Sequence, residues 1–488
     1  MRRQGEIMKF TPRPYQRLIV NHILSRERTA VWAGMGMGKT SSTLYAINLL
    51  QSVEGVGPAL ILAPLRVAVS TWPDEVAKWE DFSHMRVSVL YGSKAQRKKA
   101  LNEKADIYCV NYESLPWLVE ELDGNWPFDI IVADEATRLK SFRTRSGGSR
   151  AKALGSVAWR SEFFIELTGT PASNGLLDLW GQFWFLDKGE RLGKTMRRYQ
   201  EVYFTPIRVG ANAFAVKYEP RGFAEKAILE KTQDIALKLN AEDWFDIQKP
   251  IVMDVEVTLD EKVMKAYRSL ERNLYVELGE YAVDTANAAT KTSACLQLAS
   301  GNLYEGEEVT PDFERLAEAK AAQSVERVDG GTTKPYFHVH DSKLRALASI
   351  VEEASGMPIL VAYQFKHERD RILSYFKGSR VLDKNPQTIR DWNAGKIPML
   401  LAHPASCGHG LSMQDGGNIL VFYSTGWNLE EHEQIIERIG PTRQAQAGHP
   451  RPVFVYNIIA KDTLDEAVQE RITTKRSVLD LLMERRKA

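Results

Sequence analysis

Short apolar, β-branched segments alternate along most of the chain with segments of helical periodicity. In the first half the segments that predict strands each precede a turn or helix-capping signal, and they lie at residues 29–33, 59–63, 107–110, 130–133 and 163–167. A second series lies at residues 359–362, 399–402, 418–422 and 453–458. This alternation predicts an α/β fold with two doubly wound, parallel-sheet lobes.

Between the two series the strand pattern fades and helical segments, such as residues 261–280 and 313–325, alternate with charged, irregular sequence. We therefore expect an N-terminal lobe at residues 1–185, a mainly helical insertion and linker at residues 186–335, and a C-terminal lobe at residues 336–488. Apolar positions at helical spacing over residues 464–485 predict a last helix that packs back onto a lobe.

The composition is that of an ordinary globular protein. Because 488 residues are too many for one hydrophobic core, we expect more than one domain. The formal net charge is +1, so binding to nucleic acid must depend on local basic surface. The cysteines, Cys109, Cys295 and Cys407, form no CxxC pair, which fits a reducing compartment. The N-terminus lacks the apolar segment of a signal peptide, and no apolar stretch is long enough for a membrane span. We expect a cytoplasmic protein with no membrane partner.

A glycine-rich loop follows the first predicted strand and precedes a predicted helix at residues 40–50. Its sequence matches GxxxxGK[ST] except that Ala33 replaces the first glycine. Glycines let backbone N–H groups face phosphate oxygens, Lys39 would reach the β- and γ-phosphates, and the Thr40 hydroxyl would ligate Mg²⁺. The alternative is a glycine-rich turn with an exposed lysine, which the strand–loop–helix context disfavours. The expected nucleotide contacts are Met35, Gly36, Met37, Gly38, Lys39, Thr40 and Ser41.

Two carboxylates end the apolar strand at residues 130–133. At the carboxyl edge of a parallel sheet beside a phosphate loop, Asp134 is suited to hold Mg²⁺ through water and Glu135 to polarise the attacking water. An apolar strand that ends in Asp-Glu is common in surface turns, so the pairing with Lys39 carries this interpretation.

Several further motifs resemble the SWI/SNF-like branch of the superfamily-two helicase-type ATPases, in a compact form typical of bacteria or phages. The matching segments are Pro-Arg-Pro-Tyr-Gln at 12–16, Met-Gly-Met-Gly-Lys-Thr at 35–40, Asp-Glu-Ala-Thr-Arg-Leu-Lys at 134–140, and Leu-Thr-Gly-Thr-Pro at 167–171 with Asn174 and Leu179-Trp180. The resemblance implies two RecA-like lobes, a DNA-gripping segment at Ala63-Pro64 and residues 72–79, and adenine recognition by Gln16. It also implies coupling of hydrolysis to lobe movement through Thr168, Gly169 and Thr170.

The C-terminal lobe resembles the family more loosely. Gly408 and Gly410 fall in its glycine-rich coupling motif, where Cys407 replaces a glycine. Residues 427–438 match its WN…QxxxR pattern, and Pro441 replaces its next arginine. A two-residue insertion brings Arg443 into register. The resemblance therefore implies that Arg438 and Arg443 reach the γ-phosphate. Residue type and spacing alone fit equally well an ion pair of Arg438 with a neighbouring glutamate.

Basic residues without intervening acids follow the Asp-Glu motif, and Arg138, Lys140, Arg143 and Arg145 are candidates for contacts with DNA phosphates. A solvated basic loop is the alternative. Few aromatic residues are interleaved with them, which favours a duplex. His338 and His340 would share one face of a strand, but no third metal ligand is evident, and ordinary surface histidines are the better interpretation.

The residues thus predict an ATP- and Mg²⁺-dependent hydrolase, and the family resemblance implies that it is a translocase that moves along duplex DNA. We expect a monomer. One alternative is a helicase that separates strands. Another is an ATP-gated clamp with little turnover, which the loose motifs of the C-terminal lobe motivate and the intact Lys39, Asp134 and Glu135 oppose. Partner proteins would have to supply any nuclease or targeting function.

Overall fold

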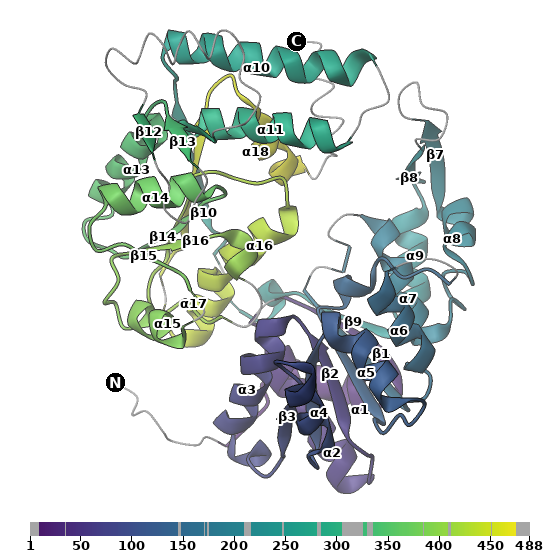
Figure 1. The fold of residues 1–488 in the computed structure, drawn as a ribbon. Helices are drawn as coiled ribbons and strands as arrows, with labels where there is room; N and C mark the ends of the chain where they lie inside the picture. Colours follow the sequence, from purple (N-terminus) through teal and green to yellow (C-terminus); the bar gives the residue numbers. More distant parts are fainter. Residues whose placement is uncertain are drawn as a thin grey trace. The chain divides into compact units, whose positions relative to one another are not determined.

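The computed structural model describes residues 9–34, 36–144, 148–169, 171–172, 175–208, 216–245, 248–280, 285–304, 326–328, 335–383, 385–407, 411–449 and 451–474. The chain forms two compact units, and the boundary between them lies between residues 247 and 248 (Figure 1). Each unit contains a parallel sheet flanked by helices, which confirms the predicted fold class.

The sheet of the first unit has the strand order β3-β4-β2-β5-β6-β1-β9, and all its strand pairs are parallel. The strands are β1 (Arg28–Ala33), β2 (Ala59–Ala63), β3 (Val87–Val89), β4 (Ile107–Asn111), β5 (Ile130–Asp134), β6 (Phe163–Thr168) and β9 (Ala236–Leu239). Because parallel strands end at one edge of a sheet, β1, β5 and β6 deliver the residues that follow them to the same place.

Alternating side chains of these strands belong to two hydrophobic cores, one on each face. In β1, Ala30 and Trp32 lie in one core, whereas Val31 and Ala33 lie in the other. The second of these cores is covered by α1 (Pro14–Leu24), α2 (Lys39–Val53), the π-helix η1 (Val67–Thr71) and α3 (Trp72–Lys78). The first core is covered by α5 (Leu115–Leu122), α6 (Ser149–Val157), α7 (Leu179–Asp187), α8 (Met196–Tyr203) and α9 (Ala224–Thr232). The remaining helix is α4 (Lys94–Asn102), and the 3-10 turns are η2 (Glu80–Phe82), η3 (Tyr112–Ser114), η4 (Ala136–Leu139), η5 (Leu176–Asp178) and η6 (Ala241–Asp243).

The described residues of the expected insertion at 186–335 are shared between the two units, so the division at residues 185 and 335 differs from the one observed. Helices α8 and α9, the antiparallel pair β7 (Phe204–Arg208) and β8 (Val216–Pro220), and the edge strand β9 belong to the first unit. The sequence pattern did not reveal β9, because the exposed Lys238 interrupts its four residues and leaves no continuous apolar run.

The sheet of the second unit has the order β10-β18-β17-β14-β16-β15. Its strands are β10 (Ile251–Val257), β14 (Ile359–Ala362), β15 (Arg380–Val381), β16 (Met399–Ala402), β17 (Ile419–Phe422) and β18 (Phe454–Ala460). Strand β10 also comes from the expected insertion, and it pairs with β18 about 200 positions later in the chain. A small antiparallel sheet consists of β11 (Asn302–Tyr304), β13 (Tyr336–His338) and β12 (Glu326–Val328).

Helices cover both faces of this second sheet as well. One core includes α13 (Ser342–Glu353) and α14 (Lys366–Tyr375), and the core on the opposite face includes α15 (Pro386–Asn393), the 3-10 turn η7 (Pro404–Cys407) and α16 (Leu429–Ile439). A third core joins α10 (Glu261–Glu280), α11 (Thr285–Ala299) and α18 (Leu464–Thr474), the described part of the expected C-terminal helix. The short helix α17 (Pro441–Ala447) follows α16. The predicted helix at residues 313–325 lies outside the described residues. In the part of the chain that the structure describes, no helix is both long and apolar enough to span a bilayer.

Candidate functional site

The phosphate loop connects β1 to α2, as the sequence predicts. Gly36 and Gly38 have φ angles of 81° and 66°, in the left-handed region that favours glycine. A Cβ atom on Gly38 would lie 2.1 Å from Nε2 of Gln16. The backbone conformation therefore favours glycine at position 38, and a side chain there would force the Gln16 amide to shift. Met37 is buried, and Met35 lies outside the described residues.

Lys39 is the first residue of α2, and its ammonium group is held by the loop itself. Nζ donates to the carbonyl oxygens of Ala33 at 2.6 Å and Gly34 at 3.2 Å. Thr40 is half-buried beside it, whereas Ser41 is buried and donates to the carbonyl of Gly38. The lysine therefore stays at the mouth of the loop, at the N-terminus of a helix, where the helix dipole favours an anion.

Gln16 connects α1 to this loop. Its side-chain Oε1 accepts from the backbone N–H of Arg13 at 2.8 Å, and Nε2 donates to Oγ of Ser41 at 3.4 Å. The glutamine expected to recognise adenine thus lies against the phosphate loop, although it is more than twenty positions away in the sequence.

Asp134 and Glu135 lie at the carboxyl edge of the same sheet. Oδ2 of Asp134 accepts a hydrogen bond of 2.9 Å from Nε1 of Trp72, and the Tyr112 hydroxyl donates to the Asp134 carbonyl. Burial raises the pKa of Tyr112 well above its ordinary value, and the charges of Asp134 and Glu135 raise it further, so the phenol stays a donor. The sequence contained no signal for the contact between Trp72 and Asp134, because it depends on tertiary packing.

Glu135 has a left-handed backbone, with φ 65°, which is uncommon for a residue with a side chain. Its Oε1 accepts from the hydroxyls of Thr137 at 3.0 Å and Thr168 at 3.4 Å. Thr168 ends β6, the strand between β5 and β1. Of the expected coupling residues, Thr168 therefore contacts the site and Gly169 follows it directly, whereas Thr170 lies outside the described residues.

Glu166 is a buried acid that the sequence analysis did not single out. It lies within β6 and is only 1% exposed. Burial raises the pKa of its carboxyl well above the ordinary value, and the charge of Asp187 raises it further. Burial therefore favours the neutral form of the Glu166 carboxyl. The sequence did contain a signal, because Glu166 is the one charged residue in the otherwise apolar segment at residues 163–167.

The basic residues after the Asp-Glu motif differ in their surroundings. Arg138 is exposed, whereas Lys140 forms an ion pair with Asp178 at 3.7 Å. The Arg143 side chain donates to the carbonyls of Lys140 and Phe142, and burial lowers the pKa of its guanidinium. Arg145 lies outside the described residues. Among the described members of this group, Arg138 is thus the one best exposed for a phosphate contact.

In the second unit, Arg438 and Arg443 reach consecutive residues of one loop. Arg438, on α16, is 1% exposed and donates from Nη1 to the carbonyl of Leu411 at 3.4 Å. Arg443, on α17, donates from Nη1 to Oγ of Ser412 at 3.2 Å. Pro441 begins α17, where its fixed φ favours a first helical position. The loop continues the expected coupling motif, whose Gly408 and Gly410 lie outside the described residues.

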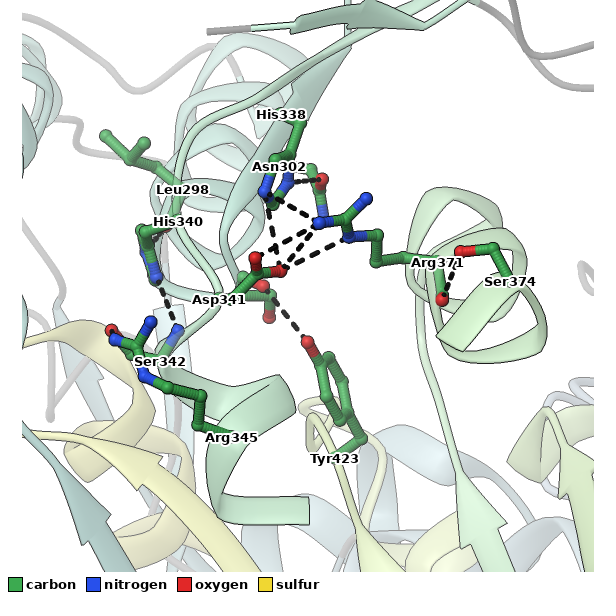
Figure 2. A network of polar contacts seen from close by, with 11 residues as sticks. Leu298, Asn302, His338, His340, Asp341, Ser342, Arg345, Arg371, Ser374 and Tyr423 are labelled. Atoms are coloured by element: carbon green, nitrogen blue, oxygen red, sulfur yellow. Dashed lines mark hydrogen bonds and ion pairs between the residues drawn. The ribbon is translucent and has the colours of Figure 1, made fainter. Parts of the chain in front are cut away.

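The two histidines His338 and His340 are buried rather than on the surface, so that expectation was wrong (Figure 2). His338 lies 3.0 Å from Asn302 Oδ1 and 3.4 Å from Asp341 Oδ1. Burial alone would raise the pKa of Asp341, but Arg371 and His338 lower it. His340 contacts the Leu298 carbonyl through Nε2. The imidazoles thus have separate partners, and the described residues contain no group of three or more metal-ligating side chains.

The chain is similar to several known proteins. The family model of the SNF2-related domain matches residues 15–294. Putative protein p41 of Acyrthosiphon pisum secondary endosymbiont phage 1 is 50% identical over 97% of this chain and 98% of its own length. An uncharacterized ATP-dependent helicase of Mycoplasma genitalium is 23% identical over 89% of this chain but only 38% of its own length. The crystal structure of the Pyrococcus furiosus Hef helicase domain has a TM-score of 0.50 at 16% identity, over 95% of this chain and 98% of that one, and shows the likeness in fold.

Proposed function

The chain belongs to the SNF2-related family, and on this premise we propose that it is a DNA-dependent ATPase that moves along double-stranded DNA. The observation that carries the proposal is that β1 and β5 end at the same edge of one parallel sheet. The loop with Lys39 follows β1 there, and Asp134 and Glu135 lie at the end of β5. Family membership implies the use of ATP. The roles of the individual residues and the DNA track are part of the proposal.

The residues present fit an ATP site. The phosphate loop offers backbone N–H groups and the N-terminus of α2, and the Lys39 ammonium would exchange its contacts with the loop carbonyls for phosphate oxygens. Thr40 and Asp134 would hold Mg²⁺, with Asp134 acting through water. When bound, the ion neutralises negative charge on the phosphates and stabilises the leaving group.

Glu135 would polarise the attacking water. The hydroxyls of Thr137 and Thr168 orient its Oε1, and an oriented carboxylate can accept a proton in a fixed direction. Thr168 begins the segment expected to couple hydrolysis to movement. Its hydrogen bond to Glu135 would therefore link the catalytic acid directly to that segment.

Arg438 and Arg443 would complete the catalytic set from the second unit. An arginine that reaches the γ-phosphate stabilises the charge of the transition state, and this contribution is worth about 10³–10⁵ in rate in related phosphoryl-transfer enzymes. Hydrolysis would then require the two units to meet, so that each ATP turnover opens and closes them once. Arg438 is buried and Arg443 is half-buried, and each donates one hydrogen bond to the Leu411–Ser412 loop, which supports this role.

The track is proposed to be duplex DNA contacted through its phosphates, with Arg138 as the best exposed basic candidate in the first unit. Protein partners, a monomeric state and a cytoplasmic location remain predictions from the sequence.

Triplex displacement tests this function directly, since a motor that moves along a duplex removes a third strand without separating the other two. We expect ATP-dependent displacement by the wild type and none by Lys39→Ala. Separation of a forked duplex without triplex displacement would favour the strand-separating helicase. Nucleotide-dependent DNA binding without either activity would favour the ATP-gated clamp.

A further inference from the structure

Trp72 makes a contact that the proposed mechanism has not used. Its indole is completely buried, and Nε1 donates to Oδ2 of Asp134 at 2.9 Å. An indole N–H is a donor only, and it does not lose its proton at any physiological pH. The ring also packs in the core beneath α1, α2 and α3. Trp72 therefore provides a fixed hydrogen-bond donor to the carboxylate expected to hold the metal.

The same residue ends an unusual turn of helix. Residues 67–71 form the π-helix η1, and the backbone N–H of Trp72 donates to the carbonyl of Val67 to close it. π-Helical turns are rare in proteins, and many of those that do occur lie at functional sites. If the turn tightened to an α-helical one, the Trp72 side chain would rotate by about 100° relative to the preceding residues, the angle per residue of an α-helix. A change of winding in η1 would thus break or reform the bond to Asp134.

The segment around Trp72 is the one that resembles the family's DNA-gripping segment, at residues 72–79. Several of its side chains reach the surface, including Asp74 and Lys78, whereas the Trp72 indole points into the core. One short helix therefore joins an exposed face to the metal-holding acid. This arrangement differs from that of Trp79, whose Nε1 donates to Glu75 within the same segment, at 2.7 Å.

We propose that Trp72 is a positioning residue that orients Asp134 for the metal ion and transmits DNA contact at η1 and α3 to this carboxylate. The part that concerns DNA rests on the proposed function, whereas the part that concerns the metal does not. Partners of a metal-ligating carboxylate orient it, and their loss typically weakens metal binding about 10–100-fold.

The alternative is that the hydrogen bond only satisfies a buried indole N–H. In that case Trp72→Phe would change stability, because it alters packing, but the dependence of nucleotide binding on Mg²⁺ would be unchanged. The metal dependence therefore separates a positioning role from a structural one.

The test compares Trp72→Phe with Trp79→Phe in the full chain. Each variant removes one indole N–H that donates to a carboxylate, which is Asp134 for Trp72 and Glu75 for Trp79. Both tryptophans lie in the same segment. Binding of a fluorescent ADP analogue is measured with Mg²⁺ and with EDTA, and thermal unfolding checks that each variant is folded. For Trp72→Phe we expect the gain in affinity that Mg²⁺ provides to fall about tenfold, with binding in EDTA unchanged. In this DNA-free assay Trp79→Phe should keep the Mg²⁺-dependent gain of the wild type.

Two further measurements complete the test. In an Asp134→Asn background, Trp72→Phe should cause no additional loss, because the indole acts through that carboxylate. In the presence of Mg²⁺, duplex DNA should change ADP affinity in the wild type, but less in Trp72→Phe. If Trp72→Phe does not fold, Trp72→His takes its place, since it restores a ring N–H, and it must retain most of the Mg²⁺-dependent gain.

An equal Mg²⁺-dependent gain in Trp72→Phe and Trp79→Phe, or a further loss in the Asp134→Asn background, would overturn the proposal. Loss of that gain in a folded Trp72→His protein would do the same. If duplex DNA does not stimulate the wild-type ATPase, the proposed function fails, yet the Mg²⁺ measurements still decide whether Trp72 positions Asp134.

Discussion

The hydroxyl of Thr168 donates to Oε1 of Glu135 over 3.4 Å, so the last residue of β6 contacts the acid that follows β5. These strands are neighbours in the sheet, and Asp134 lies opposite Leu167 in their register. The expected coupling segment therefore begins in direct contact with the expected catalytic acid, without an intervening side chain. This contact gives a physical basis for linking the two roles.

Thr168→Val should lower kcat for ATP about tenfold and change KM for ATP little, because valine keeps the shape but cannot orient Glu135. A hydrogen bond to a charged group contributes about 1.5–3 kcal/mol, and about 1.4 kcal/mol corresponds to a tenfold rate. Thr29→Val is the matched control, since its buried hydroxyl donates to the Ile235 carbonyl near the opposite end of the sheet. Steady-state ATPase rates check the prediction, and equal effects of the two variants would contradict it.

Gly38→Ala should weaken ATP binding by at least about tenfold, because alanine is strained at this positive φ and its Cβ would collide with Gln16. Gly55→Ala isolates the backbone strain, since Gly55 also has a positive φ, of 73°, but no atom lies within 4 Å of its added Cβ. We expect Gly55→Ala to lower the melting temperature slightly and to leave ATP affinity unchanged. Equilibrium binding of a nucleotide analogue compares the two, and unchanged affinity in Gly38→Ala would refute the assigned phosphate loop.

Arg438→Lys and Arg443→Lys should each reduce kcat by about 10³-fold or more while nucleotide binding is largely retained, since lysine keeps the charge but lacks the planar fork of arginine. Arg451→Lys serves as the control, because Arg451 also lies in this region and donates to Gln444 and to the Gln414 carbonyl. Single-turnover hydrolysis measures the chemical step. A normal rate in folded Arg443→Lys would mean that a different residue is the second arginine.

Glu166→Gln should make the protein progressively more stable than the wild type as the pH rises. The folded-state pKa of Glu166 lies above its ordinary value of 4.5, so its contribution to stability is fully present below that value and is lost as the pH rises towards the raised pKa. Glutamine resembles the neutral acid and does not titrate. Chemical denaturation between pH 5 and pH 9 measures the difference, with Glu256→Gln, which removes an exposed acid, as control. A pH-independent difference would show that Glu166 is ionised in the folded protein.

The main features of the site could be predicted because they depend on local sequence. Strand β1, the loop glycines and Lys39 follow one another directly, and the apolar segment before Asp134 forms a strand as expected. Strands β14 and β16 have the predicted bounds. In each case a short apolar run ends at a turn signal, and this pattern needs no knowledge of distant residues.

The missing features depend on residues far apart in the chain. Strands β9 and β10 lie in sequence that was expected to be a helical insertion, and each is defined by pairing with a distant strand, β1 or β18. The bond between Trp72 and Asp134 spans 62 positions. Pro441 looked like the loss of a functional arginine, yet it begins α17, the helix that carries Arg443. Tertiary pairing and packing determine such features, and one sequence does not display them.

The most direct test of the central claim is the steady-state ATPase rate without nucleic acid, with single-stranded DNA and with blunt duplex DNA, using Lys39→Ala as the control. We predict strong stimulation by the duplex, weaker stimulation by single strands, and no turnover in Lys39→Ala under any condition. Stimulation by single strands alone would contradict the duplex track and favour strand separation. No turnover by the wild type under any of the three conditions would contradict the proposed motor activity of this chain.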